Sequence, residues 1–161
     1  KINPQPVRED QGFDLDKASR WEITNHFLYE GSSNTAVNWI LIYRQDKSGV
    51  DGSQGDELTW FSTGIQPIYY LSDNLNLAFE YGFDHVDNQQ AGIQGELHKG
   101  TVALQLAMNR GVFARPVLRL FTTYAAWSDE FRGLVGNQPG TAPYGDSTHG
   151  WNLGLQLEAW W

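Results

Sequence analysis

Aromatic and charged side chains recur at every second position near the end of the chain, and they are the strongest candidates for binding a ligand. Phe113, Arg115 and Arg119 share one parity, and Glu158 and Trp160 share the parity of the last segment. Alternate residues of a β-strand point to the same face. Each set would therefore place an aromatic ring beside charged groups, a surface that can stack on a ligand and exchange hydrogen bonds with it. Three further charged residues fall on the polar parity of upstream segments: Glu22, Glu80 and Asp84.

Each of these candidates also has a simpler interpretation. Trp160 and Phe113 could belong to an aromatic belt or could only fill space. The charged residues could only balance one another on a wet surface, where exposed ion pairs contribute little free energy. The residues themselves leave both interpretations open.

Other kinds of chemistry find little support in the sequence. The four histidines are scattered without the spacing of metal ligands, and there is no cysteine for a disulfide or a zinc site. No nucleophile elbow, phosphate-binding loop or zinc-protease motif is present. The net charge of −8 argues against a nucleic-acid partner. We predict no enzyme activity and no required cofactor; the acidic loops Asp46–Asp56 and Val86–Gly95 are places where calcium could bind adventitiously.

The elements that would position the candidate residues are β-strands. Apolar and polar residues alternate in runs bounded by turn residues, most regularly in Leu75–His85. Residues 1–17 are polar and are expected to form a loop, with residues 18–161 forming strands of a single barrel domain. Seven strands are predicted: Arg20–Glu30, Thr35–Gln45, Glu57–Leu71, Leu75–His85, Glu96–Met108, Arg115–Trp127 and His149–Trp161.

The connections between these strands are predicted to alternate in length, short after the first, third and fifth strands and long after the second, fourth and sixth. This is the up-and-down pattern of outer-membrane barrels, which have short periplasmic turns and longer external loops. The mean hydropathy is −0.47, and no run of about 18 apolar residues could form a transmembrane helix. Alternating barrel strands do not raise mean hydropathy, so an antiparallel transmembrane β-barrel remains the predicted fold class.

The last predicted strand suggests an orientation. Leu153, Leu155 and Trp161 share the face expected to contact lipid, whereas Glu158 and Trp160 share the face expected to line the lumen. The strand would end on the side of the short, periplasmic connections. Trp161 would then be an interfacial aromatic residue at that side of the membrane.

Three stretches of the chain resemble the family of maltoporin and the sucrose porins. The penultimate hairpin of that family is similar to Lys99–Phe131, which reads KGTVALQLAMNRGVFARPVLRLFTTYAAWSDEF, and its closing strand to the ending GWNLGLQLEAWW. Another hairpin is similar to Ser62–Asp84, STGIQPIYYLSDNLNLAFEYGFD. The most specific motif is an aromatic residue, a small residue and Arg-Pro, followed by a strand that ends Thr-Tyr-Ala-x-Trp. The resemblance extends from about Ala18 to the end of the chain.

The resemblance implies a carbohydrate channel of the bacterial outer membrane. Such porins form homotrimers embedded in lipid, and each barrel of about eighteen strands encloses an aqueous lumen. Because seven strands do not close such a barrel, we expect this chain to be the C-terminal portion of a longer protein. The family's N-terminal strands and its inward-folded constriction loop would then lie outside it. The implied substrate class is oligosaccharides, with maltose and malto-oligosaccharides favoured.

The family also has an aromatic slide along the lumen, and two of its positions match this chain. They are the penultimate residue and the aromatic residue two positions before Arg-Pro, which correspond here to Trp160 and Phe113. The resemblance therefore selects the same two residues as the alternation does. Phe113 stands where maltoporin has tryptophan, which implies a narrower stacking surface. Arg115, Arg119, Glu158, Glu80 and Asp84 would form a polar track beside the slide.

Two alternatives remain open from the sequence. A soluble β-sandwich that binds carbohydrate would also be rich in tryptophan and tyrosine, but it would have no reason to separate short and long connections. A small eight-stranded barrel with a structural or adhesive role would need residues 7–17 as an extra strand, and these residues alternate poorly.

Overall fold

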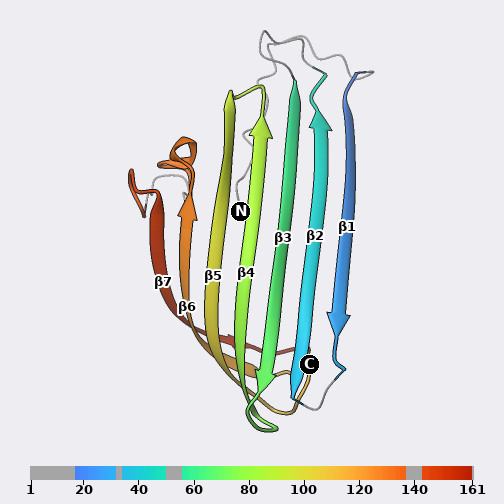
Figure 1. The fold of residues 1–161 in the computed structure, drawn as a ribbon, viewed down its shortest axis with the longest axis vertical. Coiled ribbons are helices and arrows are strands. Elements are labelled where there is room, and N and C mark those ends of the chain that lie inside the picture. Colours follow the sequence, from blue (N-terminus) through green and yellow to red (C-terminus); the bar gives the residue numbers. More distant parts are fainter. Residues whose placement is uncertain (1–16, 32–33, 50–55, 137–142, 161) are drawn as a thin grey trace.

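The computed structural model describes residues 17–31, 34–49, 56–136 and 143–160, and the described strands form one antiparallel sheet (Figure 1). The strands lie in sequence order, so each pairs with its neighbours in the chain and β1 and β7 form the two edges. A short 3-10 helix, η1 (Asp129–Phe131), follows β6. The strand bounds are β1 (Ser19–Tyr29), β2 (Thr35–Lys47), β3 (Glu57–Tyr70), β4 (Leu75–Asn88), β5 (Ile93–Ala107), β6 (Val117–Trp127) and β7 (His149–Glu158).

The strand register separates the sheet into two different faces. On the face that we call the inner face, cross-strand partners form the row Ala36, Ile68, Ala78, Ala103, Phe121 and Gly154. The first four residues of this row are buried. Small side chains in the middle of the row leave space in which other residues pack over the sheet.

The opposite face, which we call the outer face, is apolar and uncovered. Leu77, Leu104, Leu120 and Leu155 are cross-strand partners along one row. Leu104, Leu120 and Leu155 are exposed. Full burial of a leucine side chain contributes about 1.5–3 kcal/mol, so a face of this kind requires an apolar environment. The predicted alternation of polar and apolar faces is therefore confirmed.

Two apolar clusters lie at opposite ends of the sheet. We call these ends the Trp160 end, where β7 finishes, and the Trp127 end, where β6 finishes. The cluster at the Trp160 end contains Ala36, Ile68, Tyr70, Ala78 and Ala103, with Val112 and Phe121 packed against it. The cluster at the Trp127 end contains Val86, Trp127 and Phe131, with partly buried residues that include Trp60 and Tyr144.

The predicted alternation of short and long connections is wrong at one position. The segment Val86–Gly95 was expected to be a long loop, but Asp87 pairs with Gln94 and Asn88 with Ile93, so β4 and β5 continue through it. Only residues 89–92 turn, and Gly92 adopts a φ of 63° there. Its polar composition indicated a loop, whereas Val86 is in fact buried on the inner face against the Trp127 cluster.

Two strand ends also differ from the prediction, and both concern candidate residues. β6 begins at Val117 rather than Arg115, and β7 ends at Glu158. Phe113, Arg115 and Trp160 therefore lie outside the strands, and parity alone does not decide where they point. The proposed interfacial Trp161 lies outside the described residues, as do residues 1–16 of the predicted N-terminal loop. The described residues contain no helix of the length and apolar character needed to cross a bilayer.

Candidate functional site

One arginine contacts both the Trp160 ring and the backbone on either side of Phe113. The Arg115 guanidinium lies over the Trp160 ring, with 4.3 Å between Cζ and the ring centroid. Its Nη1 donates hydrogen bonds to the carbonyl oxygens of Val112 and Ala114, at 3.2 and 2.8 Å. These two carbonyls flank Phe113. Arg115 therefore fixes the backbone on both sides of Phe113 and one face of Trp160.

A carboxylate holds this arginine in place. Glu158 pairs with Arg115 through Oε1, 2.9 Å from Nη2, and with Arg119 through Oε2. Glu158 is the cross-strand partner of Val117 and Arg119 is that of Gln156, so the β6–β7 register brings these groups together. Both arginine side chains are largely buried. The three residues form what we call the arginine clamp: Arg115, Glu158 and Arg119.

Both candidate aromatic side chains remain accessible. Trp160 and Phe113 are each 58% exposed, although Arg115, which lies over Trp160, is largely buried. A planar guanidinium on one face of an indole attracts the ring quadrupole and leaves the other face free. The arrangement can therefore stack on a ligand ring but has no nucleophile poised for a covalent step.

The remaining predicted track residues lie elsewhere on the inner face. Glu80 contacts Lys99, 3.4 Å from Nζ, and accepts a hydrogen bond from Gln66 at 3.2 Å. Asp84 accepts a hydrogen bond from the indole N–H of Trp60 at 3.0 Å. The structure places both residues on the inner face, as the alternation predicts, but it does not join them to the arginine clamp.

The clamp and the aromatic pair thus sit at one end of a sheet whose other face is apolar. The family model of the LamB porins matches residues 2–161. The chain belongs to the LamB porin family. LamB porins are carbohydrate-selective channels of the bacterial outer membrane, so the protein is a channel rather than an enzyme. The predicted resemblance and the predicted fold class are confirmed.

The family assignment also decides between the alternatives. A sandwich would contain two sheets packed face to face, whereas the described strands form one open sheet, consistent with a portion of a LamB porin barrel. The eight-stranded alternative needed residues 7–17, nearly all of which lie outside the described residues. The inner face is the face that the alternation predicts to line the lumen.

Several inner-face residues were not found from the sequence. Trp60, Trp127, Tyr70 and Lys99 all have the parity of the inner face in the observed register. Trp60 and Trp127 lie near the ends of β3 and β6, at the Trp127 end of the sheet. The pairing register could have placed Trp60 on the inner face. Its partner is Val86, and the polar sequence around Val86 did not indicate a strand.

A second cluster of charged side chains, which the sequence did not predict, lies at the Trp127 end. Asp46 pairs with Arg20 across the β1–β2 ladder and with Arg44 two residues away. Within the part of the chain that the structure describes, no group of histidine and acidic side chains is arranged to hold a metal ion. The predicted calcium loop Asp46–Asp56 lies partly outside that part, and Val86–Gly95 is mostly strand.

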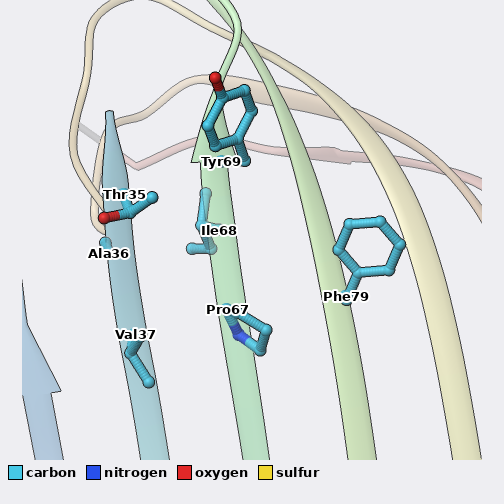
Figure 2. Close-up of a pocket in the computed structure, with 7 residues that line it drawn as sticks. All are labelled: Thr35, Ala36, Val37, Pro67, Ile68, Tyr69 and Phe79. Atoms are coloured by element: carbon cyan, nitrogen blue, oxygen red, sulfur yellow. The ribbon is translucent and has the colours of Figure 1, made fainter. Parts of the chain in front are cut away.

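A shallow apolar hollow lies away from all these residues. Figure 2 shows its lining, which comes from β2, β3 and Phe79 of β4. Pro67 is in the middle of the lining and has no N–H to donate to β4, and the β3–β4 ladder resumes only at Ile68 and Ala78. The hollow is therefore explained by the local sheet geometry and contains none of the candidate site residues.

Proposed function

We propose that this LamB porin carries linear glucose oligosaccharides, and that Trp160 and Phe113 form the end of its aromatic slide. The observation that carries the proposal is the arrangement around Arg115, which is anchored on both sides of Phe113 and stacked on Trp160. The exposed ring faces suit the apolar faces of pyranose rings, which stack on aromatic side chains.

The polar track has two parts in this proposal. Both oxygens of Glu158 are engaged by arginines, so the clamp chiefly orients the aromatic pair. Glu80 and Asp84 are partly exposed and would offer acceptors for sugar hydroxyls farther along the lumen wall. Transport requires binding that admits the sugar and still releases it, and a few stacked rings with weak polar contacts meet that requirement.

The apolar outer face indicates which environment surrounds the channel. The exposed leucine rows of that face would contact the hydrocarbon of the outer membrane. We also propose that the complete protein is a homotrimer, as the resemblance implies. Cross-linking of the protein in its native membrane would test the trimer.

The sugar proposal is tested by measuring how malto-oligosaccharides block ion current through the channel. Trp160→Ala and Phe113→Ala should each weaken sugar block by roughly three- to tenfold, because an aromatic stacking contact contributes about 1 kcal/mol. Trp21→Ala is a matched control, since Trp21 is an exposed aromatic residue on the outer face. Unchanged sugar block in Trp160→Ala would sink the proposal, and so would an equal loss in the control.

A further inference from the structure

The connection between β5 and β6, residues Met108–Pro116, is not a simple hairpin turn, and we call it the shelf. The backbone N–H of Val112 donates a hydrogen bond to Oε1 of Glu30 at 2.9 Å. Glu30 follows β1, four strands away from β5 in the sheet. Figures 1 and 2 both show this connection passing beyond the ends of β3 and β2. The shelf therefore crosses the Trp160 end of the inner face.

The first half of the shelf is anchored to the β3–β4 turn. Asn74 donates two hydrogen bonds from Nδ2, to the carbonyl oxygens of Ala107 and Met108, at 3.0 and 2.8 Å. Arg110 Nε lies 3.0 Å from a carboxylate oxygen of Asp73. The Arg110 guanidinium also lies 5.9 Å from the centre of the Tyr70 ring. These contacts fix where the shelf leaves β5.

The middle of the shelf packs on the inner face. Val112 contacts the apolar cluster at the Trp160 end, in which Ala36, Ala78 and Ala103 provide space for it. The shelf is therefore seated on the wall of the lumen and does not project away from the barrel. Its last part is held by Arg115, whose Nη1 binds the Val112 and Ala114 carbonyls.

The contact with Glu30 differs from these anchors because it joins the shelf to a distant strand. A carboxylate that accepts a backbone N–H makes a strong, charge-assisted hydrogen bond. The residue whose N–H is bound, Val112, directly precedes Phe113. We infer that the shelf is a constriction at the Trp160 end of the channel and that Glu30 is the positioning residue that holds it over the inner face.

This inference goes beyond the proposed function, because a constriction limits ions as well as sugars. If Glu30 releases the shelf, the lumen at this end becomes wider and the current through the open channel rises. Single-channel recordings in salt solution without sugar measure this directly. Their outcome does not depend on which sugar the protein carries, so failure of the sugar proposal and failure of this one are distinguishable.

The variants that test this inference replace Glu30, which accepts the hydrogen bond from Val112. In recordings of the intact channel in planar bilayers, Glu30→Ala should show excursions to a higher conductance. The fraction of recording time spent at the higher conductance should be roughly tenfold or more above that of the wild type. This is the change expected when a hydrogen bond to a charged acceptor is lost. Glu30→Gln retains an acceptor oxygen and should rescue the wild-type behaviour, with a rise of about threefold or less.

A matched control separates the hydrogen bond from the charge. Glu22→Ala removes an equal charge from the inner face of β1, where Glu22 accepts a hydrogen bond from Thr24, and it should produce no excursions. If Glu30→Ala does not assemble, Glu30→Asp replaces it in the test. Aspartate keeps the charge but its shorter side chain should not reach Val112, so the variant should still show excursions. Recordings of the assembled Glu30 variant that match the wild type, or excursions of equal frequency in Glu22→Ala, would overturn the inference.

Discussion

The two ends of the inner face use the same residue types for different purposes. At the Trp160 end the indole is 58% exposed, and an arginine covers only one of its faces. At the Trp127 end the indole is 6% exposed and packs against Tyr144, with 5.4 Å between ring centroids. A ring can stack on a sugar only if one face is accessible. Exposure, rather than residue type, therefore separates the proposed ligand-binding end from the structural end.

The charged groups differ between the two ends in the same way. At the Trp160 end, Glu158 holds Arg115 against the aromatic site. At the Trp127 end, Asp46 holds Arg20 and Arg44 on the neighbouring strands β1 and β2. The comparison predicts that changes at the Trp127 end alter stability and that changes at the Trp160 end alter sugar binding.

The largest effect is expected from Phe131→Ala at the Trp127 end. Phe131 is 1% exposed, and truncating a buried aromatic residue typically lowers the free energy of unfolding by about 3–5 kcal/mol. Urea titration of the protein in liposomes measures this loss, and sugar block of the folded protein should remain. Leu134→Ala, at an exposed residue of the same connection, should have little effect. Equal losses in both variants would break the proposed division of roles.

Gly95→Ala should have the next largest effect, from overpacking the same cluster. A Cβ at Gly95 would lie 2.9 Å from Cζ of Phe131, closer than real contacts allow. Forcing an extra methyl group into packed space costs about 1–3 kcal/mol of unfolding free energy. Gly100→Ala is the control on the same strand, because no atom lies within 4 Å of that Cβ. If urea titration gave equal stabilities for the two variants, Phe131 would not be packed against Gly95.

Arg115→Lys should affect sugar binding more than stability. Lysine keeps the charge but loses the planar guanidinium that lies over Trp160 and donates to two carbonyls. We expect sugar block to weaken by about 0.5–2 kcal/mol, the range of a partly desolvated cation–π contact. Arg44→Lys makes the same change at the Trp127 end and should leave sugar block unchanged. Equal effects of the two variants on sugar block would remove the distinction between the ends.

The smallest effect is expected from Trp60→Phe. This change keeps an aromatic ring in the Trp127 cluster but removes the N–H that donates to Asp84. The loss should be about 0.5–1 kcal/mol of unfolding free energy, because the pair is only partly buried. Urea titration measures it, with Trp39→Phe as an exposed comparison that loses a hydrogen bond to Thr63. A loss as large as that of Phe131→Ala would mean that Asp84 is a structural centre of this end.

The sequence predicts the seven strands and their two faces because apolar and polar residues alternate along each strand with a period of two. It fails at Val86–Gly95, because polar residues such as Asp87 and Gln94 give this part of the β4–β5 hairpin the composition of a loop. It also fails for the shelf, whose path depends on Glu30, a residue distant in the chain. Trp160 and Phe113 were selected by parity although neither lies in a strand. Their position at one site depends on Arg115, and no period in the sequence encodes that contact.

The hydrogen bond between Glu30 and Val112 also bears on the order of folding. Every strand of the sheet pairs with its sequence neighbour, whereas this bond joins residues 82 positions apart. Closing a longer loop costs more entropy, and contacts between nearby residues form more readily. The bond should therefore close only after the hairpins between its two residues have paired. Until then nothing holds the shelf over the Trp160 end, so the proposed constriction forms only after β2 to β5 have paired.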